Sequence, residues 1–419
     1  MTRALTAPQR LLAATLIDWI GTGFYLAISA IFLTRSVGLS AAEVGVVLAV
    51  AGFVAFAGSV QLGRLGDRFG PRRVLLALYA LRAAAFVGLT LTHQLGVTVA
   101  MLSAIALGDQ TAPSLYQALA AALVREDERV RLMARMRVVA NVGLTLGTVV
   151  VAIALAGGGD SFTTLLLANA ASYLLAAAIV ATFPRDAAAA RSATRRRLLI
   201  PSPATVAMIG INGLMSMWLV ILNVGIPLWI VSATSVPRPL VAILYATNTA
   251  VAVCAQGRVA RVVRSYERAA HAQRLAGLLL AACCGCLAAS TLTGATVSTI
   301  VLIAAVLLLS GGELLCVSSA WEVSFTLAPA DRSAEFFATY GLGRAASQVG
   351  GPILITSVVL ALGIPGWLAL AGLFLIGAAA TPLLARRARA RPLVERAAPY
   401  SAGRASTSRV ISAVSAAYS

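Results

Sequence analysis

Twelve long apolar stretches follow one another along this chain, and they constrain its fold more than any other feature. A helix needs ~20 apolar residues to cross the ~30 Å hydrocarbon layer of a bilayer, and only helices and closed barrels satisfy their backbone hydrogen bonds there. We therefore predict an all-α membrane protein. The expected spans are 11–34, 42–62, 74–92, 96–123, 132–156, 161–183, 204–232, 238–256, 271–292, 297–327, 332–360 and 362–384.

The composition excludes an ordinary soluble protein. Apolar residues make up 59% of the 419 positions, only 11% are charged, and the mean hydropathy is +0.89, whereas soluble domains carry about 25% charged residues. A net charge of +18 could indicate nucleic-acid binding, but all 33 basic residues are arginines in short groups between apolar runs. This pattern is typical of topology signals, so we expect membrane lipid as a partner and no nucleic acid.

The arginines also predict an orientation. Those of alternate connections fall on one side of the membrane, and the other side offers only Arg35 and Arg238. By the positive-inside rule, both termini are cytoplasmic in a multi-pass protein of the cell inner (plasma) membrane. The first apolar stretch resembles a secretory signal, but it contains Asp18 and is long enough to span, so we expect a retained helix.

A polar, basic segment at 184–203 divides the twelve stretches into six and six. We predict two six-helix bundles, 1–183 and 204–385, joined by a cytoplasmic linker and followed by a disordered tail at 386–419. The halves repeat each other weakly. Gly108-Asp109 matches Gly312-Glu313 at an offset of 204, and at an offset of 207 Glu128, Arg137, Asn141 and Gly143 match Glu335, Arg344, Gln348 and Gly350. Because both halves start on the same side, the repeat is parallel.

The connection after the second stretch carries a motif, Gly63-Arg64-Leu65-Gly66-Asp67-Arg68-Phe69-Gly70-Pro71-Arg72-Arg73. It resembles the signature Gly-x-Leu-x-Asp-Arg-x-Gly-x-Arg/Lys of the major facilitator superfamily. We expect a short loop between two antiparallel helices, with glycines where the backbones turn or pack closely. The resemblance implies a transporter in which Asp67 latches the cytoplasmic side by binding the amino end of the eleventh helix. An ordinary surface ion pair is the alternative interpretation.

Other motifs of the superfamily are eroded here. Ala104 stands where many proton-coupled members carry an arginine four residues before a glycine, here Gly108. The fifth stretch lacks the Gly-Pro pair of many antiporters, and the second copy of the loop motif, at 256–261, lacks the acid. Drug–proton antiport therefore does not follow from the motifs alone.

Four acids lie inside apolar stretches, where an ionisable residue is costly unless it faces protein or water. They are Asp18, Asp109, Glu313 and Glu322. The resemblance places the first, fourth, seventh and tenth helices around a central cavity, so Asp18, Asp109 and Glu313 become candidates for proton coupling. Glu322 follows Glu313 by nine residues and so points to nearly the opposite face of a helix. We expect it to pair with a cytoplasmic arginine.

Two alternatives remain open for these acids. Arg82 or Arg344 could neutralise them as purely structural partners, and Arg344 could instead bind an anion. Further residues are candidates for contact with a substrate in the cavity, although anchoring in the membrane explains the aromatic ones equally well. These are Tyr25, Tyr116, Asn212 and Trp218.

The sequence favours a secondary active transporter that exports a small organic molecule while protons move inward, by alternating access. We expect a monomer that needs no cofactor or metal, and we expect Cys283, Cys284 and Cys286 to serve helix packing. Nucleotide hydrolysis has no support, because the chain contains no phosphate-binding Gly-x-x-x-x-Gly-Lys-Ser/Thr loop. Uptake by symport or facilitated diffusion is the alternative for transport, and a sensor without flux the alternative outside it. Histidines are too few for an enzyme site.

Overall fold

The computed structural model describes residues 5–91, 94–156, 162–184, 199–234 and 236–393. Within these ranges nearly all regular structure is helical, and one isolated bridge joins Pro201 to Leu393. The helices are α1 (Ala7–Arg35), α2 (Ala41–Phe69), α3 (Pro71–Leu91), α4 (Leu95–Leu123), α5 (Glu126–Ala156), α6 (Phe162–Ala181), α7 (Pro203–Met215), α8 (Trp218–Val220), α9 (Ile226–Ala233), α10 (Leu240–Val262), α11 (Tyr266–Ala289), α12 (Ala295–Leu327), α13 (Ser333–Leu354), α14 (Leu360–Leu362) and α15 (Ile364–Ala390).

Several of these helices continue one another and cross the molecule as single rods. A π-helical turn at Ile221–Gly225 joins α8 to α9, and another at Ile355–Val359 joins α13 to α14. Counted in this way, 11 described helices are long and apolar enough to cross a membrane. The 29-residue α1 is a further helix of membrane-crossing length and packs against α5 and α6. The prediction of an all-α membrane protein is confirmed.

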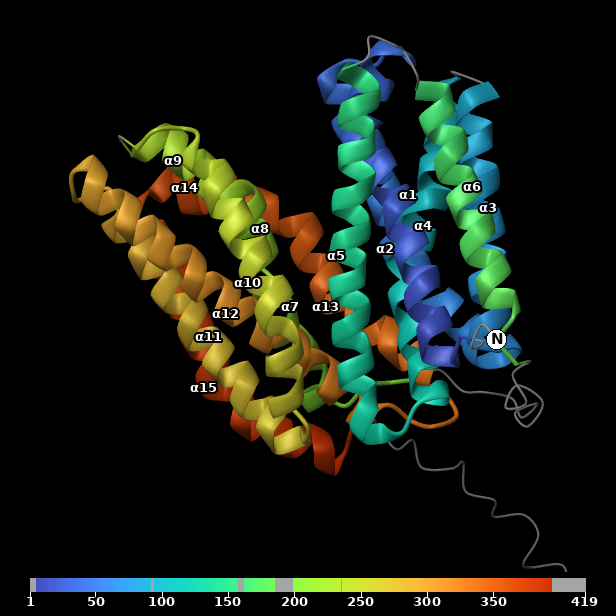
Figure 1. The fold of residues 1–419 in the computed structure, drawn as a ribbon. Helices are drawn as coiled ribbons and strands as arrows, with labels where there is room; N and C mark the ends of the chain where they lie inside the picture. The colour runs from blue at the N-terminus through green and yellow to red at the C-terminus, as the bar shows by residue number, and fades with distance from the viewer. Residues whose placement is uncertain (1–4, 92–93, 157–161, 185–198, 235, 394–419) are drawn as a thin grey trace, which may run out of the picture.

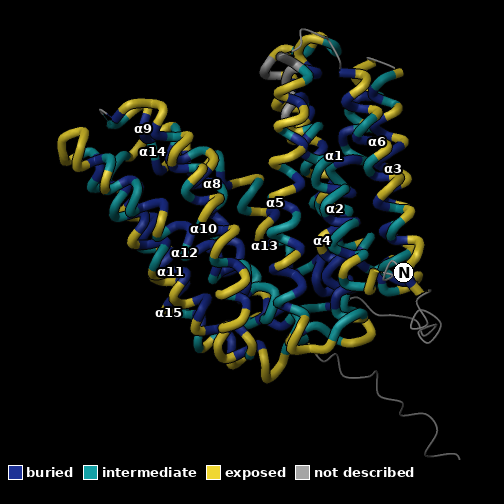
Figure 2. The backbone as a smooth tube through the Cα atoms, viewed as in Figure 1, coloured by how far each residue is buried: buried dark blue, intermediate teal, exposed yellow. Residues whose placement is uncertain are grey.

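The helices form two bundles, α1–α6 and α7–α15, which lie side by side in Figure 1. They approach each other at one end and diverge at the other. One buried apolar cluster fills the first bundle and continues into the neighbouring ends of α11, α12 and α13, whereas a second cluster lies only in the second bundle. In Figure 2 the buried positions accordingly run along the inside of each bundle and gather where the two bundles meet.

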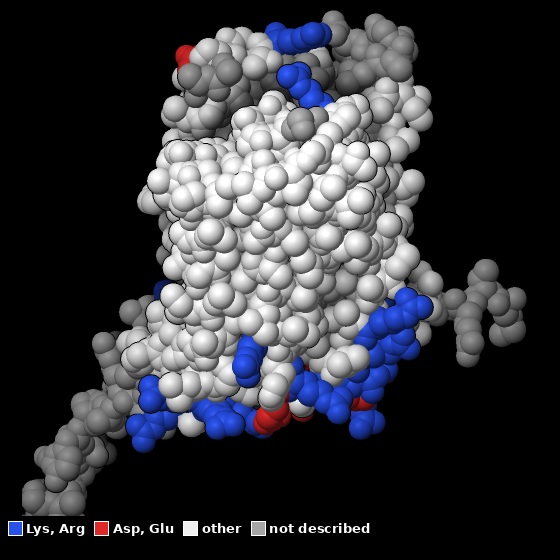
Figure 3. All heavy atoms as spheres, turned by 90° about the vertical axis from the view of Figure 1, so that its left-hand side faces the viewer, with Lys and Arg blue, Asp and Glu red and all other residues white. Residues whose placement is uncertain are grey.

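The end at which the bundles meet also carries most of the charge. Figure 3 shows a broad uncharged belt with a dense row of arginines at its lower edge and only a few charged residues above it. We call this the arginine-rich end. Its arginines include Arg68, Arg72, Arg125, Arg264 and Arg387, which lie at the terminal turns of their helices or just beyond them.

The structure corrects the predicted loop after the second stretch. We expected a loop around Gly63, Gly66 and Gly70, but α2 continues to Phe69 and only Gly70, at φ 93°, turns the chain. Gly63 has the other expected role, close helix packing, because a Cβ there would lie 2.8 Å from the carbonyl oxygen of Ala334 on α13. Small residues allow such close helix contact.

Other differences concern helix ends. α5 begins at Glu126 and not at 132, with three acids in its first turn where they complement the helix dipole. α15 runs to Ala390, past the expected boundary at 385. Most of the predicted linker and tail, 185–198 and 394–419, lies outside the described residues.

Candidate functional site

The first bundle holds a buried network of charges centred on Arg82. This residue lies eleven positions after the start of α3, ~16 Å along the helix at ~1.5 Å per residue, and its side chain is 2% exposed. Arg82 Nη1 lies 3.2 Å from Asp18 Oδ1 on α1, and Arg82 Nη2 forms an ion pair with Asp109 on α4. Arg82 also donates to the hydroxyl of Tyr173 at 2.6 Å, and its Cζ lies 3.8 Å from the centroid of the Tyr173 ring.

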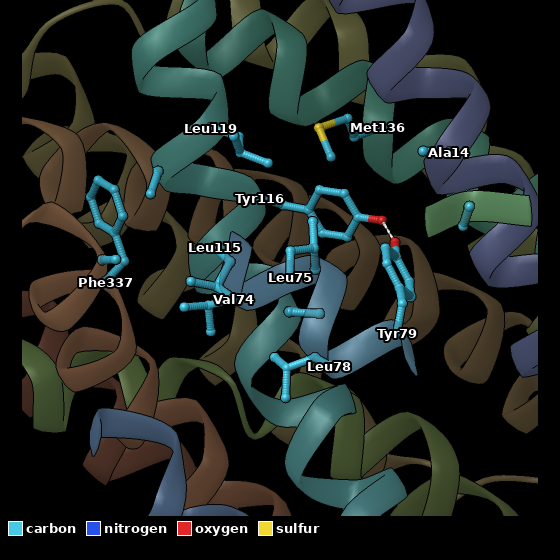
Figure 4. Close-up of a cluster of buried hydrophobic side chains, with 14 of the residues drawn as sticks. Ala14, Val74, Leu75, Leu78, Tyr79, Leu115, Tyr116, Leu119, Met136 and Phe337 are labelled. Atoms are coloured by element: carbon cyan, nitrogen blue, oxygen red, sulfur yellow. Dashed lines mark hydrogen bonds between the residues drawn. The ribbon is translucent and has the colours of Figure 1, made fainter. Parts of the chain in front are cut away.

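Two tyrosines complete this network on the side of Asp18. The hydroxyls of Tyr79 and Tyr116 lie 3.2 and 3.3 Å from Asp18 Oδ2 and bond to each other. In Figure 4 the pair is surrounded by apolar side chains, among them Leu75 and Met136. Tyr116, a candidate for substrate contact, therefore lies in the core of the first bundle.

The two acids of the network differ in exposure. The side chain of Asp18 is 6% exposed, while that of Asp109 is 43% exposed although it pairs with the same arginine. Two carboxylates share one guanidinium, so the network carries one net negative charge when both are ionised. Asp109 is therefore the more exposed of the two acids.

The acid of the second bundle has its cation on the other bundle. Glu313 on α12 is 3% exposed and forms an ion pair with Arg137 on α5. Its second oxygen accepts a 2.7 Å hydrogen bond from Asn248 Nδ2 on α10. Arg137 also lies 5.4 Å from the ring centroid of Trp218. The contact between Arg137 and Glu313 thus spans the interface between the bundles.

Paired glycines explain why the two acids find different partners. A Cβ on Gly108 would lie 2.4 Å from Arg82 Cδ, and a Cβ on Gly312 would lie 2.9 Å from Leu280 Cγ. The repeat therefore places Leu280 of α11 where α3 carries Arg82. Because this position of the second bundle lacks a cation, Glu313 draws its counter-charge from outside the bundle.

Arg344 is not the partner of Glu313, contrary to one of the alternatives left open by the sequence. It lies eleven positions after the start of α13, is exposed, and forms no ion pair with any described residue. It is close enough to Arg137 to interact with it electrostatically. Among the described residues, Arg344 is thus a cation without an anionic partner.

A second contact between the bundles lies at the arginine-rich end. The carboxylate of Asp67 accepts hydrogen bonds from the backbone N–H groups of Ala334 (2.9 Å) and Glu335 (2.8 Å) at the start of α13. Arg64 lies 2.7 Å from the Glu335 carboxylate. Such charge-assisted bonds to a helix N-terminus are stronger than neutral ones.

The remaining residues of the motif fix the local turn. Arg72 donates to the carbonyls of Val180 (3.3 Å) and Ala181 (2.6 Å) at the end of α6, and Arg68 lies over the ring of Phe69. The second copy of the motif lacks the acid. Its Arg258 bonds within its own helix, and its Ala260 makes apolar contact with Val130 and Ala134 of α5. Within the described residues, the hydrogen bonds of Asp67 to α13 therefore have no counterpart in the second copy.

The other predicted residues are scattered. Tyr25 packs edge-on against Phe86 at 5.1 Å, and Asn212 is buried on α7 with no hydrogen-bond partner for its Oδ1. Glu322 forms no ion pair with a described residue, and the arginine that interacts with it electrostatically is Arg129.

Sequence reasoning missed several residues that this arrangement depends on. Tyr79 and Tyr173 each place a hydroxyl in an apolar stretch. Glu335, which pairs with Arg64, was noted only as the repeat partner of Glu128. Arg137 was noted only as the repeat partner of Arg344. A charged residue this deep in the fifth stretch was itself the signal for a functional or pairing role.

The sequence of this chain matches the model of one protein family. Residues 11–352 match the family model of the Major Facilitator Superfamily. No curated protein sequence matches significantly.

Solved structures share the fold at low sequence identity. A bacterial homologue of the iron transporter ferroportin in an outward-facing state matches with a TM-score of 0.71 and 15% identity, over 92% of this chain and 100% of the other. The human organic anion transporter MFSD10 gives 0.67 and 16%, over 90% and 100%. The proton:xylose symporter XylE gives 0.63 and 14%, over 92% and 95%.

Proposed function

This chain belongs to the major facilitator superfamily, whose members are transporters and not enzymes, and we propose that it couples the export of a small organic molecule to inward proton movement. The observation that carries the proposal is the ion pair between Arg137 and Glu313, because it joins the two bundles deep inside an apolar molecule. We further propose that the chain acts as a monomer with bundles at 1–183 and 204–385.

The orientation follows from charge. We place the arginine-rich end in the cytoplasm, where basic connections concentrate. The contacts of Asp67 with α13 then close the cytoplasmic side, and the diverging ends of the bundles face outward (Figure 1). The similar ferroportin homologue was likewise solved in an outward-facing state.

Rocking of the bundles gives Glu313 two environments. In the present state its charge is balanced by Arg137 of the other bundle. When the bundles separate at the arginine-rich end, the two groups move apart, and an ionised carboxylate left alone in a low-dielectric interior is strongly disfavoured. Proton uptake by Glu313 is therefore linked to opening of this end.

The immediate surroundings of Glu313 support this link. Arg137 on α5 is the cation in contact with it, and Asn248 of α10 donates to its other oxygen while also bonding Ser310 at 3.0 Å. A proton arriving from outside would neutralise Glu313, weaken the interface, and allow the inward-facing state.

The network around Arg82 has a different part in this scheme. Asp18, Asp109 and Arg82 all belong to the first bundle, so a rigid-body rotation leaves their contacts intact. We assign them to holding the bundle together and to shaping the charge of the site, and we assign coupling to Glu313.

Transport by reconstituted vesicles tests the proposal. A substrate is first identified by screening compounds for resistance in a host that lacks its own pumps. Vesicles with an imposed pH gradient should then drive its accumulation against its own gradient, with proton movement reported by a pH-sensitive dye. Glu313→Gln should abolish gradient-driven accumulation and retain exchange of substrate across the membrane. Accumulation that ignores the gradient at every pH would contradict coupling, and net flux in the opposite direction would favour uptake by symport.

A further inference from the structure

Arg344 is a charged side chain at membrane depth that the proposed cycle does not use. It lies ~16 Å along α13 from the helix start at ~1.5 Å per residue, close to the depth of Arg137 on α5. The residue is exposed, and no carboxylate of the described residues lies within ion-pair distance of it.

The position of α13 shows which way this exposure is directed. The helix packs against α2 and α4 of the first bundle and against α7 of its own. Arg344 interacts electrostatically with Arg137, which lies on the other side of the bundle interface. Against lipid, a guanidinium without a partner would cost several kcal/mol. Its exposed surface therefore belongs to the space between the bundles.

The balance of charge at this depth is uneven. Arg137 is neutralised by Glu313, so Arg344 on α13 adds one net positive charge near this ion pair. Inside the first bundle, by contrast, Arg82 pairs with two acids, Asp18 and Asp109. The described residues contain no group of three or more His, Cys, Asp or Glu able to hold a metal ion. A metal cation is therefore a poor fit for the site, and an anion is a good one.

We propose that Arg344 binds the anionic group of the transported molecule, which makes the substrate class a small organic anion bearing a carboxylate, sulfonate or phosphate. The guanidinium presents a planar set of donors suited to these groups. This inference rests on the proposed transport function but does not depend on proton coupling.

The first test needs no substrate and compares the rates at which anionic and cationic reagents label a thiol beside Arg344. Gln348 is one helical turn from Arg344 and partly exposed, so Gln348→Cys places a thiol beside the guanidinium. The exposed Cys254 is replaced by Ser in the same protein. The thiol is then treated with anionic sulfonatoethyl and cationic trimethylammonioethyl methanethiosulfonate. We expect the anionic reagent to gain about tenfold in relative rate, compared with the ratio for free cysteine.

Substitutions then assign the effect. Arg344→Gln should remove the preference, and Arg344→Lys, which keeps the charge, should retain most of it and report whether the site stays folded. Arg261→Gln is the matched control, because this exposed arginine of α10 bonds only within its own helix. A rate ratio like that of free cysteine, a ratio unchanged by Arg344→Gln, or no labelling by either reagent would overturn the proposal.

Protection by a ligand tests the substrate class. Dansylglycine carries a carboxylate and dansylamide is its neutral analogue, so the two probes differ mainly in charge. Dansylglycine should slow labelling of the introduced thiol at concentrations at least about tenfold lower than dansylamide. Protection no better than that by dansylamide would contradict an anion site. Loss of coupling in Glu313→Gln with intact anion preference would leave this inference standing, and the reverse result would leave proton coupling standing.

Discussion

The two bundles neutralise their deep acids in different ways. In the first bundle, Arg82 pairs with both Asp18 and Asp109, and all three residues move together. In the second, Leu280 occupies the position of Arg82, and Glu313 depends on Arg137 from across the interface. One arrangement holds a bundle together, and the other joins two bundles.

In the proposed cycle, this difference locates conformational coupling in the second bundle of a repeated fold. The repeat places Asp109 and Glu313 at matching positions, yet in the proposed cycle only Glu313 loses its counter-charge when the bundles rotate. A charge that is compensated in one state and not in the other gives the proton a differential interaction with the two states, which is what linkage requires.

The largest expected effect is a loss of stability when the buried cation of the first bundle is removed. Arg82→Gln leaves two acids at depth without their cation, which costs ~3–5 kcal/mol for a buried pair broken on one side. Thermal unfolding in detergent should show a much lower melting temperature than wild type. Arg137→Gln is the comparison, because Glu313 can accept a proton and the bundles can separate. Equal losses in the two variants would remove the distinction between them.

The close packing of α1 on α5 gives the next effect. A Cβ on Gly143 would lie 2.7 Å from the carbonyl oxygen of Leu16, whereas a Cβ on Gly350, its predicted repeat partner, meets nothing within 4 Å. Gly143→Ala should destabilise the protein by ~1–3 kcal/mol through overpacking. Gly350→Ala should be neutral or slightly stabilising. Similar melting temperatures for the two variants would contradict this asymmetry.

Loss of the latch should shift the conformational equilibrium without unfolding the protein. Asp67→Asn keeps one acceptor oxygen but removes the charge that faces the start of α13, at a cost of ~1 kcal/mol or about fivefold in population. A thiol at Ala338, buried against Gly63, should then react faster with N-ethylmaleimide. Arg258→Gln, in the motif copy without an acid, should leave the rate unchanged. A slower or equal rate in Asp67→Asn would contradict the latch.

The smallest effect is expected for the exposed acid of the first bundle. Asp109→Asn keeps an acceptor for Arg82 and removes the excess negative charge, so gradient-driven transport should stay within about twofold of wild type. Vesicle flux measured beside Glu313→Gln gives the contrast. If Asp109→Asn instead abolished coupling, the two acids would have equivalent roles, and the difference between the bundles would not matter for transport.

Much of the architecture could be predicted from local pattern. Apolar length alone placed α6 at 161–183, against Phe162–Ala181 in the structure, because a lipid solvent leaves a spanning segment few alternatives. The motif around Asp67 directed attention to the start of α13. The extension of α2 through Gly63 was not predicted, because glycine marks both turns and close helix contacts.

The pairing of charges could not be predicted in the same way. Arg137 and Glu313 are 176 positions apart, and whether they meet depends on how one bundle is rotated against the other. On sequence grounds Arg82 and Arg344 were the candidate partners of the buried acids, and Arg137 was not among them. The choice among these arginines is made by packing between helices, which hydropathy and repeat offsets do not record.

In the proposed cycle, proton binding at Glu313 controls separation of the bundles at the arginine-rich end. Spin labels at Glu128 and Arg264, both exposed at that end on different bundles, allow the distance between them to be measured by double electron–electron resonance in protein lacking Cys254. Lowering the pH should protonate Glu313, weaken its ion pair with Arg137, and raise the population of long distances. Glu313→Gln should show that population at every pH. A wild-type distribution that ignores pH, or a pH response that persists in Glu313→Gln, would contradict the account.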